Sequence, residues 1–542
     1  MKRLLGILLA LVMLLSALTA GAEEILSFPF VEEGQNVTLT VSVPTNESFG
    51  PAADMWCWKW LSEKTGISFV FNEIDNSVRE EKLNLMFSSN DLTDLILGFG
   101  LSNLDLIKYG EETHALAALN NLVDDYAPNL SAFFEVNPTA KAQCTAPDGN
   151  IYALCKWTDD LPEQVFSNDR AWINQQWLTN LGLERPETLD EFYEALVAFR
   201  DEDPNGNGEN DEIPICDIPG NIATAIWSAY GVVAHLGTST VDPAVKKGEA
   251  VIPAASDMYR SFIETMRQWY EEGLIDPDCY TLTDTQLSAK ATERRIGVQF
   301  RSAAHTLQSE GWEEWESLPV VTSEFNDTKV WPGADLFIGG NIAMSAGCQN
   351  KEAAMRVIDW FYTERASVYF HYGPMEGTED ETMGIAGWYF DEAGNGPLHH
   401  LADNDKYASY PSDLYYRSAL VAPVGCYGLA VPFKGMYDLF GVEAAGRTGA
   451  AGHWRRSVNE YTRQYFTETF PSVYLTTEES QKVTELYTPL KDYVTIMEPK
   501  FITGIEPMEN FDAYIEQLNV LGLQEYTEIY TNAYNIYKAN LE

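Results

Sequence analysis

The sequence predicts an α/β protein built of at least two lobes, each able to bury a core of its own. The chain has 542 residues, which exceeds what one hydrophobic core usually holds. Hydrophobic residues make up 45% and aromatic residues 12%, a composition typical of a globular protein. Short strand patterns alternate with amphipathic helix patterns, and this order is typical of parallel strands joined by crossover helices.

The first lobe shows this alternation over residues 37–97. Apolar and polar residues alternate over 37–43, which predicts a strand, and two later apolar runs are short enough to be strands as well. The segments between the strands are amphipathic. We therefore expect strands over 37–43, 67–71 and 95–97, and helices around 55–64 and 82–88.

The second lobe is expected to open near residue 165, and it contains a helix with clear ends. Thr188 and Glu191 have the spacing of a capping box, and Asp201 ends the helix. Its apolar face consists of Phe192, Leu196 and Phe199.

From about residue 381 the chain reads mostly helical. The last segment, 523–541, carries tyrosines every three or four positions, which favours a packing stripe over a ligand site. These are Tyr526, Tyr530, Tyr534 and Tyr537.

The loop that follows Asp201 has the oxygen spacing of a calcium site. One register begins at Asp201 and meets the D-x-[DN]-x-[DN]-G-x5-E pattern through Glu212. A second register begins at Asp203. Pro214 prevents the exit helix of an EF-hand, so we expect a calcium loop outside that fold, with a merely solvated acidic turn as the alternative.

The beginning of the chain is typical of an exported protein. Lys2 and Arg3 precede an apolar run over 4–18, and small residues follow it, so we expect a signal peptide over 1–22 cut before Glu23. That run is shorter than the roughly 20 residues that span a bilayer, and no later stretch predicts a transmembrane segment. The mature chain is therefore expected in the periplasm or at the cell surface.

Charge and cysteine content exclude several classes of function. The formal net charge is −46, which argues against nucleic acid as a partner because binding it requires basic patches. Seven scattered cysteines without CxxC spacing indicate neither a zinc site nor a dense disulfide framework, and most are expected to be buried thiols. The first is Cys57, so no lipid-anchor cysteine is evident.

In the order of its segments, the sequence resembles the extracellular solute-binding proteins of ABC importers, family 1, and among them the calcium-bearing alginate and oligosaccharide binders. The stretches that carry the resemblance are 82–95, 146–154, 172–183, 203–208, 211–214, 269–277 and 352–362. The resemblance implies a two-lobed periplasmic-binding-protein-like fold of class II with a hinged cleft. Lobe 1 would comprise 23–160 and 335–380, and lobe 2 would comprise 161–334 and 381–542.

The resemblance further implies a monomer that is not an enzyme, binds an oligosaccharide and delivers it to the permease subunits of an ABC importer. It also implies a structural calcium ion held in the second register, with Glu209 using its main-chain carbonyl. The implied ligands are Asp203, Asn205, Asn207, Glu209, Asp211 and Glu212.

Sugar sites combine aromatic rings with polar side chains, so we nominate residues just past a strand end or in glycine-bounded loops. Phe300 and Arg301 follow an expected strand, and Trp388 and Tyr389 follow a glycine between the lobes. Trp331 and Trp227 are weaker candidates, while Trp172 and Trp177 are expected in the core.

Two other functions remain open at this stage. A secreted glycoside hydrolase or lyase could also contain calcium and many aromatic residues, but carboxylate pairs cannot be selected by spacing among 81 acidic residues. No G-x-S-x-G, P-loop or HExxH motif occurs, and the adjacent His399 and His400 point in different directions in most local structures. A peptide or another small solute on the same fold is the third reading.

Overall fold

The computed structural model describes residues 27–32, 34–46, 49–157, 170–301, 310–333, 337–383, 385, 387–390, 397–400, 416–422 and 449–541. The chain divides into two compact units. The first comprises Met1–Trp157, Gly339–Phe390 and Pro397–Met436, and the second comprises Thr158–Ile338, Asp391–Gly396 and Tyr437–Glu542. The expected lobe boundary near 380 remains a prediction, because much of 391–448 lies outside the described residues.

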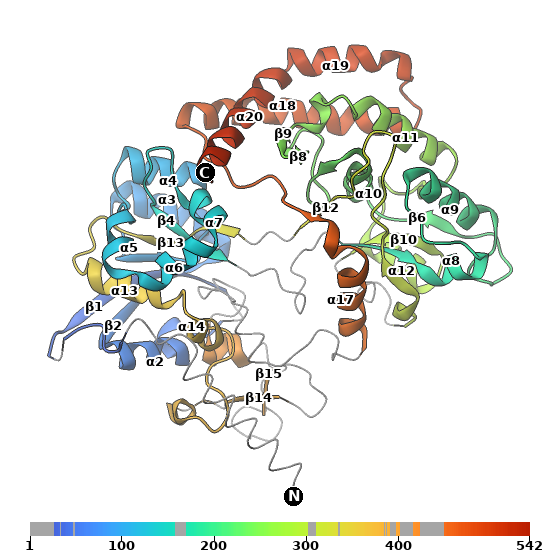
Figure 1. Cartoon of the computed structure of the whole chain (residues 1–542). Helices are drawn as coiled ribbons and strands as arrows, with labels where there is room; N and C mark the ends of the chain where they lie inside the picture. The colour runs from blue at the N-terminus through green and yellow to red at the C-terminus, as the bar shows by residue number, and fades with distance from the viewer. Residues whose placement is uncertain are drawn as a thin grey trace, which may run out of the picture. The chain divides into compact units, whose positions relative to one another are not determined.

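A mixed sheet forms the centre of the first unit. In the described chain its order is β2-β1-β3-β13-β4. β1 (Val37–Thr45) runs parallel to β2 (Ile67–Asp75) and to β3 (Leu95–Leu97). β13 (Phe337–Met344) runs antiparallel to β3, and β4 (Ala153–Trp157) completes the sheet. Late residues therefore lie among early ones, as the yellow elements among blue ones show in Figure 1.

Helices cover this sheet with an aromatic layer. Trp56, Trp58 and Trp60 of α2 (Trp56–Thr65) are buried, and the Trp58 ring lies 5.3 Å from that of Phe69 on β2. Gly66 ends α2 at φ +75°, a conformation that glycine adopts without strain. The other helices of this unit are α3 (Arg79–Ser89), α4 (Asn103–Leu106), α5 (Asn120–Tyr126), α6 (Pro128–Val136), α7 (Pro138–Cys144), α13 (Lys351–Trp360) and α14 (Glu364–Tyr369). The short strands β14 (Trp388–Phe390) and β15 (Pro397–His399) pair with each other.

The second unit has a sheet of order β11-β5-β10-β6 in the part of the chain that the structure describes. β10 (Ile296–Phe300) runs parallel to β6 (Ile213–Ile215) and antiparallel to β5 (Ala171–Asn174). β11 (Trp315–Ser317) is the edge strand beside β5. The helices are α8 (Gln175–Leu181), α9 (Leu189–Asp201), α10 (Pro219–Trp227), α11 (Tyr259–Glu271) and α12 (Asp284–Thr292), and a small sheet consists of β7 (Val232–Val233), β8 (Ala244–Lys246) and β9 (Glu249–Val251).

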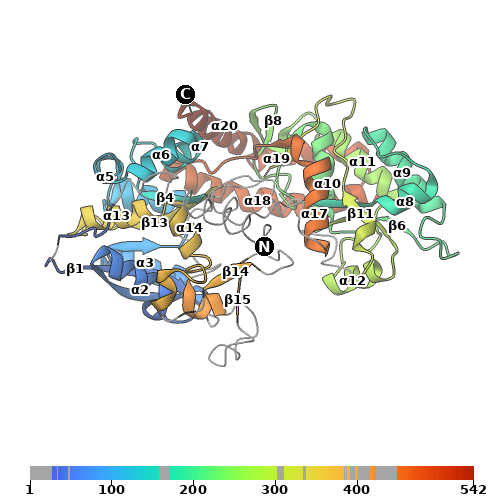
Figure 2. The ribbon, with the colours of Figure 1, turned by 60° about the horizontal axis from the view of Figure 1, so that its bottom comes forward.

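The C-terminal region packs back onto this unit. α18 (Thr477–Ile502) contacts α11 and α20 (Leu523–Ala539), which Figures 1 and 2 show as red helices beside green ones. α17 (Gly449–Tyr461) packs on β11, and α19 (Phe511–Val520) connects the last long helices. β12 (Trp331–Pro332) pairs with β16 (Phe466–Thr467), so this unit too is assembled from distant segments.

The elements expected over 37–97 and 188–201 are confirmed, whereas the strands β14, β15 and β16 interrupt the region from about 381 that was expected to be mostly helical, and part of that region lies outside the described residues. All five expected elements of 37–97 form, and α9 begins at a capping box made by Thr188 and Glu191. Tyr526, Tyr534 and Tyr537 are buried in α20, as the packing stripe predicted. Six cysteines are free and buried, while Cys426 and the expected signal peptide lie outside the described residues.

One buried carboxyl group joins three segments of the second unit. Glu498 on α18 accepts hydrogen bonds from Thr240 Oγ1 at 2.5 Å and from the Tyr259 hydroxyl on α11. The Tyr259 hydroxyl in turn lies 2.8 Å from that of Tyr514 on α19. Burial raises the pKa of Glu498 from 4.5 to about 6.

This group should make stability depend on pH. Because its pKa is higher in the folded chain, its contribution to the free energy of unfolding is complete below the unfolded pKa and is lost as pH rises through about 6. Relative to Glu498→Gln, the wild type should lose about 2 kcal/mol between about pH 4 and pH 7 in urea denaturation. The exposed Glu485→Gln is the control, and an equal pH dependence in wild type and Glu498→Gln would contradict the assignment.

Candidate functional site

At the carboxyl ends of β6 and β10 an aspartate and an arginine side chain lie close together. The two strands are parallel, so the residues that follow them emerge at the same edge of the sheet, where ligands bind in α/β folds. Asp217 follows β6, Arg301 follows β10, and Arg301 Nη1 lies 4.0 Å from Asp217 Oδ1.

Asp217 is held firmly at this edge. It is fully buried and accepts hydrogen bonds from Phe300 N at 3.1 Å, Ile218 N at 2.8 Å and Asn221 Nδ2 at 2.8 Å. Burial raises the pKa of Asp217, and the Arg301 guanidinium opposes that rise. The Arg301 side chain remains 23% exposed, so its N–H groups can reach a polar ligand while the carboxylate orients them.

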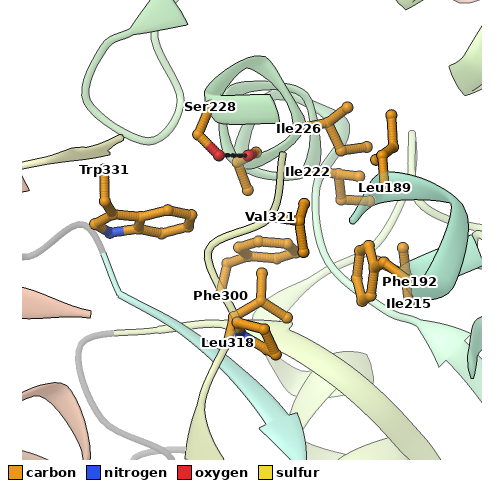
Figure 3. Close-up of a pocket in the computed structure, with 12 residues that line it drawn as sticks. Leu189, Phe192, Ile215, Ile222, Ile226, Ser228, Phe300, Leu318, Val321 and Trp331 are labelled. Atoms are coloured by element: carbon orange, nitrogen blue, oxygen red, sulfur yellow. Dashed lines mark hydrogen bonds between the residues drawn. The ribbon is translucent and has the colours of Figure 1, made fainter. Parts of the chain in front are cut away.

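The neighbouring aromatic candidates of this unit are buried. Phe300 and Trp331 line a small pocket within the unit, with Trp331 at one side and Leu189 with Phe192 at the other (Figure 3). The hydroxyl of Ser228 in its wall already donates to Ala225 O at 2.7 Å. The space inside is close to that of one water molecule, too small for a sugar ring.

The remaining candidates lie at separate places. Trp227 is fully buried, with its ring 5.9 Å from that of Phe262. In the first unit, the buried Trp388 donates from Nε1 to Gly373 O at 2.9 Å. Tyr389 is half-buried and stacks on His400 with ring centroids 3.7 Å apart. Arg301 and Tyr389 are therefore the nominated side chains that keep surface open to solvent.

Sequence reasoning missed Asp217. Its signal was weak, because one aspartate after a three-residue strand has no motif. What identifies Asp217 as a site residue is that β6 and β10 are neighbours and that a charged residue follows each of them. The sequence does not show that these two strands pair in parallel.

The acidic loop folds around the oxygens of the second calcium register. Asp203 accepts from Asn207 N at 3.0 Å and from Gly208 N at 2.9 Å. Asn205 Oδ1 also accepts from Asn207 N, at 2.9 Å. Gly206 and Gly208 take φ values of +72° and +81°, which permit this tight winding.

Two acids close the loop. Asp211 pairs with Arg295 Nε at 2.9 Å, and Glu212 Oε1 is buried with no hydrogen-bond partner. Burial raises the pKa of Glu212, and the charges of Asp203 and Asp211 raise it further. A buried carboxylate oxygen without a donor, close to two other acids, is the environment that a cation would stabilise.

The first register fits less well, since Asp201 is paired with Arg200 through two hydrogen bonds of 2.6 and 2.8 Å. No group of three His, Cys, Asp or Glu side chains in the described ranges is gathered into a metal cluster as it stands. The side-chain oxygens of Asn205 and Asn207 and main-chain carbonyl oxygens could also be ligands, because hard cations such as calcium bind neutral oxygen atoms as well as carboxylates. His399 Nε2 bonds Tyr372 O at 2.9 Å, and the His400 ring stacks on Tyr389.

The family model for bacterial extracellular solute-binding proteins matches residues 44–368, more than half of the chain. The protein belongs to this family. Of the described helices, none is sufficiently long and apolar to cross a membrane.

One relative extends this result, both by its sequence and by its solved structures. The fructooligosaccharide ABC transporter substrate-binding protein FusA of Streptococcus pneumoniae is 28% identical over 491 residues, covering 89% of this chain and 86% of FusA. The solved structure of FusA with kestose has a TM-score of 0.62 at 26% identity, over 93% of this chain and 100% of that one. An EF-hand mutant of FusA with fructo-nystose has a TM-score of 0.62 at 25% identity, over the same shares.

Truncation of Phe300 tests whether its ring belongs to the core or to a ligand surface. Phe300→Ala should lower the free energy of unfolding by about 3–5 kcal/mol, because it leaves a cavity among buried side chains. Phe325→Ala is the matched control, since that ring is 43% exposed in the same unit. Unchanged urea denaturation together with weaker ligand binding would instead place Phe300 on the ligand surface.

Proposed function

We propose that this protein is exported, captures an oligosaccharide and delivers it to the permease subunits of an ABC importer. The observation that carries the proposal is the 28% identity to FusA, which extends over 89% of the chain and is not confined to one motif. The fold and the charged strand edge are in keeping with it, because open α/β sheets bind ligands at the carboxyl ends of their strands.

The described side chains suit reversible sugar binding. Arg301, oriented by Asp217, can donate to hydroxyl oxygens, and the ring of Tyr389, stabilised by His400, can offer a face to a pyranose or furanose C–H surface. Lobe closure about the crossing segments would exclude water from these contacts and open again for release. Capture as a monomer without chemical change is the role proposed here.

A binding protein and a glycoside hydrolase or lyase make opposite predictions. Purified protein should bind a fructooligosaccharide such as kestose, or another member of an oligosaccharide panel, stoichiometrically in calorimetry with a micromolar or tighter Kd. Prolonged incubation should release no new reducing ends or unsaturated products. A maltose-binding protein treated identically controls for contaminating enzymes. Product release at a rate proportional to protein concentration would contradict the proposal, and binding of peptides alone would redirect it to another solute.

We also infer that the loop over residues 203–212 holds a structural calcium ion. The unpartnered oxygen of Glu212 and the ordered oxygens of Asp203 and Asn205 support it, as does an EF-hand in a relative of similar length. Bound calcium would supply positive charge to the acidic loop and would take no part in ligand chemistry. Asp203, Asn205, Asn207, Glu209, Asp211 and Glu212 remain the proposed ligands.

Calcium should raise the thermal midpoint of the wild type, and chelator should lower it. A ligand present at a hundredfold its Kd stabilises the folded state by about 2.7 kcal/mol. Asp203→Asn should abolish most of this response, whereas Asp201→Asn should retain it, because Asp201 is paired with Arg200. Asp203 is a cleaner test than Asp211, which also pairs with Arg295. An equal calcium response in both variants would exclude the Asp203 register.

A further inference from the structure

In the second unit, the carboxylate that orients Arg301 also holds a second polar side chain. Asn221 lies in the first turn of α10, and its Nδ2 donates to Asp217 Oδ1 at 2.8 Å. The same oxygen lies 4.0 Å from Arg301 Nη1. The amide and the guanidinium therefore approach one carboxylate oxygen, and their nitrogen atoms lie no farther apart than the sum of these two distances.

The hydrogen bond to Asp217 decides which way the Asn221 amide faces. Asp217 is fully buried and also accepts from the main-chain N–H groups of Ile218 and Phe300, so its carboxylate acts as an acceptor on both oxygens. An ionised carboxylate can only accept, and of the two ends of an amide only the NH₂ group donates. The nitrogen of Asn221 therefore faces Asp217, and its oxygen points away from that carboxylate.

The Asn221 amide oxygen has room for a hydrogen-bond donor. Asn221 is half-buried, and its Oδ1 accepts no hydrogen bond from any residue that the structure describes. The exposed Gly237 lies beside this oxygen with a φ of +83°, and a Cβ atom there would come within 3.3 Å of Oδ1. Because glycine has no Cβ atom, position 237 leaves that side of the oxygen uncovered.

An exposed apolar side chain adjoins the amide. Ile218 lies one turn before Asn221, which donates from its main-chain N to Ile218 O at 3.1 Å, and the two side chains are neighbours at the start of α10. The Ile218 side chain is 42% exposed at the edge where β6 ends. Sugar sites pair apolar surface with a few oriented polar groups, and this edge has both. Sequence reasoning missed these two residues because neither of them is aromatic.

We propose that Asn221 and Ile218 are ligand-binding residues and that they select a neutral sugar ring with a hydroxyl group next to an apolar C–H face. This inference rests on the proposed oligosaccharide function and adds two contacts to the site of Arg301. The sugar hydroxyl donates to Asn221 Oδ1, and the C–H face packs on Ile218. An ionised sugar carboxylate has no proton to donate to this oxygen, so a neutral ring fits better. Asp217, buried beneath these groups, is a positioning residue.

Truncation of Asn221 separates this inference from the proposed function. Calorimetry on the wild type would first select the tightest binder among kestose, maltotriose, xylotriose and lacto-N-tetraose. Asn221→Ala should weaken binding of that sugar by about fivefold or more, because one hydrogen bond is lost. Asn180→Ala is the matched control and should stay within about twofold, since Asn180 Nδ2 also makes a hydrogen bond, to Pro204 O at 2.7 Å, away from this edge.

The outcomes distinguish the two levels. Equal affinity in wild type and Asn221→Ala would overturn the inference and leave the oligosaccharide function standing. If the wild type binds none of the four sugars, the proposed function fails for them and the inference fails with it.

Deoxygenated sugars test whether Asn221 touches the ligand or only supports Asp217. Monodeoxy derivatives of the selected sugar would be measured with the wild type and with Asn221→Ala. At one hydroxyl position, deoxygenation should weaken wild-type binding by about fivefold and binding to the variant by less than about twofold, because the partner of that hydroxyl is already missing. Equal losses in both proteins at every position would show a structural role and overturn the proposed contact.

The apolar contact has a test of its own. Ile218→Ser removes the apolar surface while the main-chain N–H that bonds Asp217 remains, and serine is a favoured residue at this N-cap position of α10. Binding of the selected sugar should weaken by about threefold or more, and the thermal midpoint of the free protein should change little. Ile505→Ser is the control, because that side chain is 74% exposed in the same unit. Unchanged affinity in Ile218→Ser would remove Ile218 from the site.

Discussion

The return of β13 to the first sheet is the constraint on which the first unit depends. β13 places Ala343 opposite Ile96 of β3 and separates β3 from β4 in the strand order. Gly340 makes the close approach possible, because a Cβ atom there would lie 2.0 Å from Leu101 O at a φ of +61°. Without β13, the backbone groups on that side of β3 would lose their partners, and only those facing β1 would keep theirs. The chain therefore passes through Thr158–Ile338 of the second unit before it returns to complete the first sheet.

The second unit is also assembled from segments that are distant in the sequence. These segments are joined by hydrogen bonds between polar side chains as well as by strand pairing. Trp331 of β12 pairs with Phe466 of β16, and Glu498 of α18 accepts from Thr240 and Tyr259. The sheet edge that presents Arg301 is therefore supported by segments from both ends of the unit. Rigid support of this kind lets a partly exposed guanidinium keep one orientation with little loss of entropy on binding.

The crowding of acidic side chains decides the electrostatics of the loop that follows α9. Where Asp203, Asp211 and Glu212 crowd together, their repulsion favours a cation. In a chain with a net charge of −46, acidic neighbours arise easily from composition, so the regular spacing of the oxygens is the feature that distinguishes this loop.

Local pattern was sufficient for much of this protein. The strand of 37–43, the capping box of Thr188, the tyrosine stripe of α20 and the oxygen spacing after Asp203 are all encoded within a few neighbouring residues, where periodicity and turn chemistry act directly. The resemblance of ordered segments then indicated the family. Tertiary structure alone decided that β13 enters the first sheet, that Asp217 meets Arg301, and that Phe300 and Trp331 face a core. Each of these depends on which distant segments pack together, and no local spacing records that.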